Sequence, residues 1–329
     1  MSRDILPRSI VLNGRKKLHV LEANSGKINQ LPLRKVESEE HGRETMIKQY
    51  INVFKLRIGF VIALAALGGM AITPGASLPI WKTLVLFLTV LMGSAAAGAF
   101  NQYSERDIDA KMMRTKNRPF VSGFFQHSRK WLAVIGLMLL VAVVSAALAL
   151  NAMAALNIFL GAFTYAIVYT VWLKQRTWLN IVFGGLAGSF AVLAGAAAVD
   201  PSFGPLPGLL ALVLFLWTPP HFWSLAIAYR DQYAAAGIPM LPVVKGNRKA
   251  ARIILGHTIF LVLVSLMPVY YGLGWIYLAG ALLGGGYFLF KSVQLVRNPT
   301  RQTAMANFFA SMIQLSVLLF ALMLEVNFA

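Results

Sequence analysis

Three oxygen-bearing residues recur at a spacing that could hold a metal ion. Asn101, Glu105 and Asp109 are each four residues apart. A helix through this segment would align them on one face, about 6 Å apart per step, with Asp107 pointing away. Hard oxygen donors suit Mg²⁺, which usually shares its coordination shell with the phosphate oxygens of a substrate. The spacing therefore predicts a magnesium site for a phosphorylated ligand.

Basic residues come directly after this acidic segment. Arg114, Lys116 and Arg118 follow Asp109 within the same loop. Arginine presents a planar fork suited to phosphate oxygens, and lysine presents a compact charge. Bases also anchor the cytoplasmic loops of membrane proteins, so topology alone could account for some of them. Their position next to the acids favours diphosphate binding.

A second polar segment lies much later in the chain. Pro219 and Pro220 are expected to interrupt the sixth apolar span, because proline removes a backbone donor and kinks a helix. His221 follows them and is either a hydrogen-bonded helix residue or a contact to a polar or metal-bearing substrate. Asp231 could ligate a second Mg²⁺ across from Asp109. Two separated segments are therefore expected to form one site.

The composition excludes several classes of protein. Of the 329 residues, 58% are hydrophobic and only 13% are charged, which is not typical of a water-soluble domain. The net charge of +18 lies between long apolar runs and indicates membrane topology, so nucleic acid is not expected as a partner. The chain has no cysteine, which excludes disulfides, cysteine-bound metals and thiol nucleophiles.

The apolar runs predict an all-α membrane protein with about nine transmembrane helices. A bilayer core of roughly 30 Å needs about 20 apolar residues per helix. These uniformly apolar runs also lack the alternation of barrel strands. The approximate limits are 53–73, 83–103, 131–150, 152–173, 178–199, 207–228, 253–272, 274–290 and 304–325.

Lysine and arginine predict the orientation. All but one of the 30 lie in the N-terminal segment or in loops on the same side, and only Lys82 lies opposite. The positive-inside rule makes the shared side, with the N-terminus, cytoplasmic. We expect residues 1–50 to form a polar cytoplasmic tail and residues 51–329 the transmembrane domain. The tail has no apolar signal core and is rich in acids, so a bacterial inner membrane is favoured over a mitochondrial one.

These motifs resemble a known family. Asn101-x-x-x-Glu105-x-x-x-Asp109 is similar to the N-x-x-x-D-x-x-x-D motif of the UbiA superfamily of intramembrane prenyltransferases, with Glu105 where aspartate is commoner. The similarity extends over roughly residues 50 to 325. The segments 107–119, 219–223 and 231–242 look like the branch that farnesylates heme, and 165–174 resembles a segment whose lysine helps to hold diphosphate.

The resemblance implies a UbiA-type helical bundle that transfers a farnesyl group from farnesyl diphosphate to a vinyl group of heme B, giving heme O. Mg²⁺ is the implied cofactor, and its implied ligands are Asn101, Glu105, Asp109 and Asp231. The residues implied to bind diphosphate are Arg114, Arg118, Lys174, Arg57 and Lys116. Those implied to contact heme or the prenyl chain are His221, Phe222, Trp223, Tyr165, Tyr169 and Tyr233. Further partners would be the lipid bilayer and a downstream heme-modifying enzyme or terminal oxidase assembly.

Two other functions stay open at this point. A UbiA-type enzyme acting on an aromatic quinone precursor would share both metal segments. The histidine at position 221 and the loop that follows Asp231 argue against it. A polytopic carrier would also contain kinked helices and buried acids, but carriers usually place their polar residues at mid-membrane. The polar residues of this chain cluster at one surface instead.

Overall fold

The fold is an antiparallel bundle of long helices, seen here in a computed structural model that describes residues 45–328. The chain divides into two units at residues 45 and 46, and the architecture below is that of the second unit. Most of the predicted tail, residues 1–44, lies outside the described residues. Within residues 45–328 there is no β-strand, as the apolar runs predicted.

Eight helices are long and apolar enough to cross a bilayer. A ninth span results if the helix Thr45–Val53 and α2 are counted together across a bend of 49°. The α2 helix of that bent pair runs from Leu56 to Ala71. The single-helix spans are α3 (Ile80–Ser104), α5 (Lys130–Ala149), α9 (Pro205–Ala228), α12 (Asn247–Tyr270), α13 (Trp275–Arg297) and α14 (Arg301–Phe328). The composite spans are α6 (Ala152–Phe163) with the π-helix η1 (Thr164–Leu173), and α7 (Asn180–Gly184) with α8 (Leu186–Val199). The prediction of about nine spans is confirmed.

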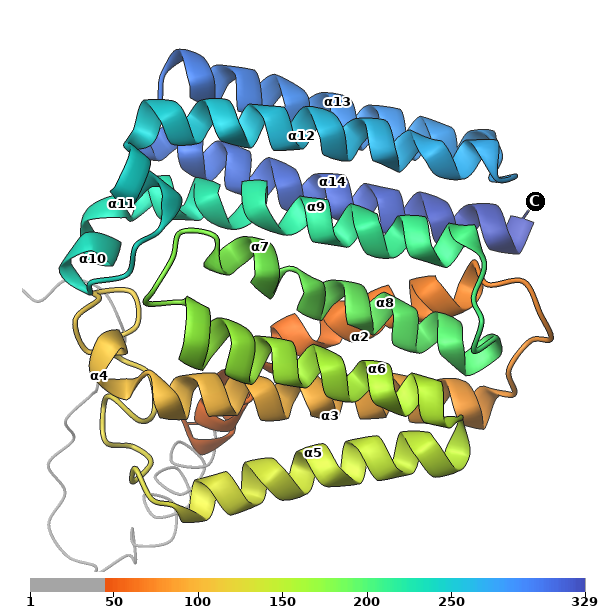
Figure 1. Ribbon diagram of the computed structural model, residues 1–329, viewed down its shortest axis with the longest axis horizontal. Helices are drawn as coiled ribbons and strands as arrows, with labels where there is room; N and C mark the ends of the chain where they lie inside the picture. The colour runs from red at the N-terminus through yellow and green to blue at the C-terminus, as the bar shows by residue number, and fades with distance from the viewer. Residues whose placement is uncertain (1–44, 329) are drawn as a thin grey trace, which may run out of the picture. The chain divides into compact units, whose positions relative to one another are not determined.

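Short helices gather at one end of the bundle. They are α4 (Arg106–Asp109), α10 (Arg230–Ala235) and α11 (Leu241–Lys245), and Figure 1 shows all three at its left-hand end, opposite the C-terminus. We call this the basic end, because it carries the two long basic loops, residues 101–130 and 229–252. The amide of Arg114 in the first loop donates to Gln232 Oε1 in α10 at 3.3 Å. The two loops that the sequence marked as functional therefore touch.

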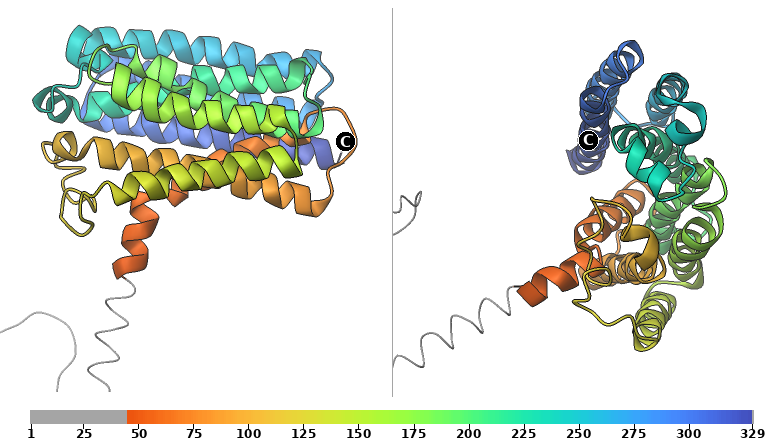
Figure 2. Two further views of the ribbon diagram at one scale, coloured as in Figure 1. Left: turned by 60° about the horizontal axis from the view of Figure 1, so that its bottom comes forward. Right: turned by 90° about the vertical axis from the view of Figure 1, so that its left-hand side faces the viewer.

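Small residues allow the helices to approach closely. A Cβ atom at Gly195 in α8 would overlap the carbonyl oxygen of Ala66 in α2, and one at Gly69 would overlap the carbonyl oxygen of Val192. Such contacts between small residues are a common way to pack helices in a membrane, where the hydrophobic effect does not drive helix association. Helix α2 packs against α3, α8 and α14, so it lies inside the bundle (Figure 2).

The expected interruption at the two prolines is wrong. Pro219 and Pro220 both lie inside α9, which continues unbroken to Ala228. Each proline removes only one backbone donor, and neighbouring groups in a membrane helix can compensate for the freed carbonyls. The helix is therefore continuous through His221.

Candidate functional site

The predicted stripe of oxygen donors exists, although its helix is broken. Helix α3 ends at Ser104, and α4 begins at Arg106 after a non-helical residue, Glu105. The hydrogen bonds from Glu105 N to Asn101 O (3.0 Å) and from Asp109 N to Glu105 O (2.8 Å) preserve the four-residue register across this break. Asn101, Glu105 and Asp109 are only 2%, 2% and 3% exposed. The side chain of Asp107 points outward and is 84% exposed, as expected.

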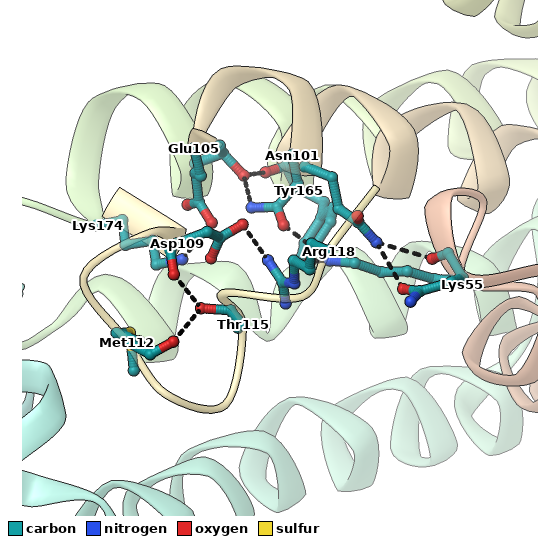
Figure 3. Close-up of polar contacts among 12 residues, drawn as sticks. Lys55, Asn101, Glu105, Asp109, Met112, Thr115, Arg118, Tyr165 and Lys174 are labelled. Atoms are coloured by element: carbon teal, nitrogen blue, oxygen red, sulfur yellow. Dashed lines mark hydrogen bonds and ion pairs between the residues drawn. The ribbon is translucent and has the colours of Figure 1, made fainter. Parts of the chain in front are cut away.

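Each member of the stripe is paired with a cation from a different segment (Figure 3). Lys174, at the end of η1, donates to Glu105 Oε2 at 2.5 Å. Arg118, in the loop after α4, donates to Asp109 Oδ2 at 2.6 Å. The acids are therefore neutralised by two of the bases predicted to bind diphosphate.

The third cation is Lys55, which the sequence did not single out. Its ammonium group donates to Asn101 Oδ1 at 2.7 Å and to the Tyr165 hydroxyl at 2.9 Å (Figure 3). Lys55 sits at the bend before α2 with a φ of 48°, and no other non-glycine residue in the described range has a positive φ. Arg57, the predicted residue two positions later, is exposed and forms no hydrogen bond or ion pair with the described residues. Of these two bases, Lys55 is therefore the one that contacts the stripe, and the role of Arg57 in binding diphosphate stays a prediction.

The π-helix η1 arranges the side chains that face the stripe. Its turns close one residue later than those of an α-helix, as in the bond from Lys174 N to Tyr169 O at 2.9 Å. The ammonium of Lys174 consequently lies 5.6 Å from the centre of the Tyr169 ring, which stacks on Tyr165 with centroids 5.5 Å apart. Thr170 receives a hydrogen bond from the Asn101 amide at 3.0 Å. One short segment of π-helix therefore supplies aromatic, hydroxyl and cationic contacts together.

The remaining predicted bases are at the surface. Arg114 is exposed, but its guanidinium lies beside Tyr233. Burial raises the pKa of the Tyr233 hydroxyl, and Arg114 offsets part of that rise. Tyr233 therefore stays protonated at neutral pH. Lys116 is exposed, and its side chain forms no hydrogen bond or ion pair in the described part of the protein.

Asp231 does not join the other acids. It is exposed on α10, and its side chain has no partner within residues 45–328. In the same range, no three histidine or acidic side chains lie close enough together to hold a metal ion. The pairing of Glu105 and Asp109 with basic side chains supplies the positive charge that a metal would otherwise provide. The four-residue ligand set stays a prediction.

The predicted aromatic residues converge at the basic end. Tyr169, Trp223 and Tyr233 are buried in one apolar cluster, and Tyr165 and Phe222 pack against it. The cluster includes Met112 from the loop after α4, so it joins the two predicted segments. His221 lies beside it, 8% exposed, and its ring meets that of Phe222 edge-on at 5.1 Å.

These features can be compared with known proteins. The sequence pattern of the UbiA prenyltransferase family matches residues 62–316. The chain belongs to the UbiA prenyltransferase family. Within this family it is 58% identical to protoheme IX farnesyltransferase 2 of Paramagnetospirillum magneticum, over 85% of this chain and 97% of the relative. Protoheme IX farnesyltransferase 1 of the same organism is 48% identical, over 83% of this chain and 96% of the relative.

Solved structures support the UbiA fold. A structure of digeranylgeranylglyceryl phosphate synthase has a TM-score of 0.71 at 18% identity and covers 85% of this chain and 98% of that one. A UbiA homologue from Archaeoglobus fulgidus, bound to DMAPP and Mg²⁺, has a TM-score of 0.64 at 17% identity and covers 82% and 99%. At these identities the likeness concerns the fold, which is the predicted UbiA-type bundle.

Two features of this UbiA protein were missed in the sequence. Lys55 was visible as a base at the start of the first span, but its inward direction depends on a backbone conformation that the sequence does not signal. The π-helix was not visible, because residues 164–173 have the same apolar composition as an ordinary α-helical span. Both features determine which side chains reach the stripe.

Proposed function

We propose that this prenyltransferase transfers the farnesyl group of farnesyl diphosphate to a vinyl group of heme B, giving heme O. The choice of heme B as the acceptor rests on the 58% identity to a protoheme IX farnesyltransferase, over nearly the whole length of that relative. The observation that supports the donor is the buried set of acids and cations at the basic end. The protein is a multi-pass membrane protein, and a farnesyl chain partitions into the same apolar phase as its helices.

The residues of the stripe fit a magnesium ion. Glu105 Oε1 is buried and has no hydrogen-bond partner, so a carboxylate oxygen remains available for a cation. Asn101 and Asp109 add oxygen donors on the same face, and Asp231, which is exposed on α10, would have to turn toward the ion to complete the predicted set. All four are hard oxygen donors, the type that Mg²⁺ prefers. Bound Mg²⁺ would act as a Lewis acid that stabilises the negative charge of the departing diphosphate.

The basic residues would bind and neutralise diphosphate. In the proposed reaction, the allylic carbon–oxygen bond breaks and its electron pair leaves with the diphosphate. Arg118, Lys174 and Lys55 lie among the acids and would turn to the phosphate oxygens as the charge develops. Arg114, Lys116 and Arg57 carry further positive charge in the flanking segments, from which they could reach the outer oxygens. Catalysis would rest on charge stabilisation, with no covalent enzyme intermediate.

The aromatic cluster would protect the allylic cation. The π-electrons of the heme vinyl group attack that cation, and the resulting charge on the heme side is then discharged by water, which loses one proton. Tyr165 and Tyr169 present stacked rings beside the cations, and aromatic faces stabilise positive charge. Phe222, Trp223 and Tyr233 extend the same apolar cluster. Such a lining would keep bulk water away until the new bond has formed.

We place the active site at the cytoplasmic face of a bacterial inner membrane, with the N-terminus inside. The support is the concentration of lysine and arginine at the basic end. Heme O would pass from there to a downstream heme-modifying enzyme or to a terminal oxidase assembly.

Incubation of membranes that contain the protein with heme B, farnesyl diphosphate and Mg²⁺ tests this function. We expect a new heme with the mass of heme O, and none when either substrate is omitted. A matched reaction should offer an aromatic quinone precursor as acceptor. Prenylation of that compound, with heme B unchanged, would overturn the assignment of the acceptor.

A further inference from the structure

The surroundings of His221 fix the position of its proton. His221 Nδ1 lies 2.7 Å from the Ser311 hydroxyl oxygen, which comes from α14. The single hydroxyl proton of Ser311 is already committed, because it is donated to the carbonyl of Phe308 at 2.6 Å. Ser311 can therefore only accept from His221, so Nδ1 carries the imidazole proton. The other ring nitrogen, Nε2, is then an unprotonated lone-pair donor.

The ring that carries this lone pair is also held in place. Trp217 stacks on one side of His221 with centroids 4.2 Å apart, and Phe308 stacks with centroids 4.4 Å apart. The Trp217 indole nitrogen donates to the carbonyl of Ser311 at 2.8 Å. Ser311, which is fully buried, thus orients both the histidine and the tryptophan that stacks on it.

The Nε2 atom itself has no protein partner. No hydrogen bond to it is formed by residues 45–328, and it is not among the fully enclosed polar atoms of that range. A buried structural histidine normally uses both nitrogens, because an unsatisfied polar atom costs free energy. His257 in α12 also leaves Nε2 without a hydrogen bond among these residues, but it is only half-buried, and its Nδ1 bonds to the carbonyl of Ile253 within its own helix, at 3.1 Å.

We propose that Ser311 is a positioning residue that holds His221 as a ligand for the iron of the metalloporphyrin acceptor. Histidine ligands of metals usually donate their second ring N–H to a fixed acceptor, which sets the tautomer and the ring orientation. The Ser311 hydroxyl is such an acceptor. Coordination would form one bond between Nε2 and iron and would release no proton, because Nε2 carries none. This inference rests on the proposed function, since heme B is its ligand.

The test uses purified full-length protein with heme B and no farnesyl diphosphate. We expect bound ferric heme to show the electron-spin-echo modulation of a coordinated histidine nitrogen, and His221→Gly to lose that signal and regain it with added imidazole. Ser311→Ala should weaken heme binding by about 10- to 100-fold, the usual effect of losing such a partner. Ser311→Thr keeps the hydroxyl and should behave like the wild type.

Two controls separate positioning from folding. His257→Gln removes a histidine of the neighbouring helix and should leave heme binding and its spectrum unchanged. Ser311→Ala should bind Mg²⁺ with inorganic pyrophosphate as tightly as the wild type, which would show that the bundle is intact. Wild-type heme affinity and an unaltered nitrogen signal in Ser311→Ala would overturn the inference.

The two proposals can fail separately. Histidine-ligated heme in a protein that forms no heme O would remove the proposed function and keep the role of His221. Heme O formation by a protein whose bound heme lacks a histidine nitrogen signal would keep the function and overturn the role of His221.

Discussion

Lys174 and Glu105 form an ion pair that occupies only one oxygen of the carboxylate. The ammonium lies 2.5 Å from Oε2, while Oε1 is buried without a partner among the described residues. Arg118 engages Asp109 in a similar pair, at 2.6 Å. The cations proposed to bind diphosphate therefore restrain the acids proposed to bind metal. Binding of either ligand should favour binding of the other, because each releases side chains that the other needs.

The pairing of Lys174 with Glu105 predicts that the Lys174→Gln variant is destabilised and that Mg²⁺ restores its stability. Lys174→Gln removes the charge that neutralises Glu105, and an uncompensated buried carboxylate is costly. We expect a clear fall in melting temperature, which Mg²⁺ alone should reverse more strongly than it stabilises the wild type. Affinity for inorganic pyrophosphate with Mg²⁺ should fall about tenfold, since one phosphate-binding cation is lost.

Lys116→Gln is the matched control for that experiment. It removes an exposed lysine of the loop after α4 whose side chain forms no hydrogen bond or ion pair among the described residues. We expect its melting temperature and its response to Mg²⁺ to equal those of the wild type. If Mg²⁺ stabilised Lys174→Gln no more than Lys116→Gln, the coupling between the two ligands would be refuted.

The burial of Asp109 and the exposure of Asp107 make a second prediction. Asp109→Asn keeps the shape of the side chain but removes the charge proposed to bind the metal, so heme O formation should fall by about 100-fold or more. Asp107→Asn changes a carboxylate that is 84% exposed and should stay within about twofold of the wild type. The rate of heme O formation in membranes measures both. Equal losses would show that the outward-facing acid takes part.

Lys55 and Arg57 form a third matched pair. Lys55→Met removes the ammonium that lies between Asn101 and Tyr165, and a hydrogen bond to a charged group contributes about 1.5–3 kcal/mol. We expect kcat/KM for farnesyl diphosphate to fall roughly 10- to 100-fold. Arg57→Met should have a much smaller effect, because Arg57 contacts none of these residues. Steady-state kinetics at saturating heme B would reveal an opposite ranking if Arg57 were the true ligand.

The sequence was sufficient for the fold and for part of the site. Apolar runs must form helices in a bilayer, so the nine spans followed from length alone. The spacing of Asn101, Glu105 and Asp109 survived a break in the helix, because the backbone hydrogen bonds kept the register. Local periodicity therefore predicted which face of the segment is buried.

Contacts between distant helices were beyond the reach of the sequence. The inward direction of Lys55 depends on one unusual backbone angle, and the contacts of Tyr169 with Lys174 depend on a π-helix. In the sequence, Ser311 is a small residue of an apolar span, and its contact with His221 arises only from the packing of α14 against α9. The continuity of α9 through two prolines was also misjudged, since a local rule ignores the neighbours that tolerate the lost donors. Each of these features arises from tertiary packing.

The close approach of α2 and α8 gives a prediction about stability. A Cβ at Gly195 would overlap the carbonyl oxygen of Ala66, which is backbone and cannot move without shifting a helix. We expect Gly195→Ala to lower the free energy of unfolding by about 1–3 kcal/mol, the usual cost of overpacking a close contact. Gly256→Ala in α12 is the control, because no atom lies within 4 Å of the position of its new Cβ. Thermal unfolding in detergent should show a lower melting temperature for Gly195→Ala and an unchanged one for Gly256→Ala. Equal melting temperatures for the two variants would contradict the close packing of α2 against α8.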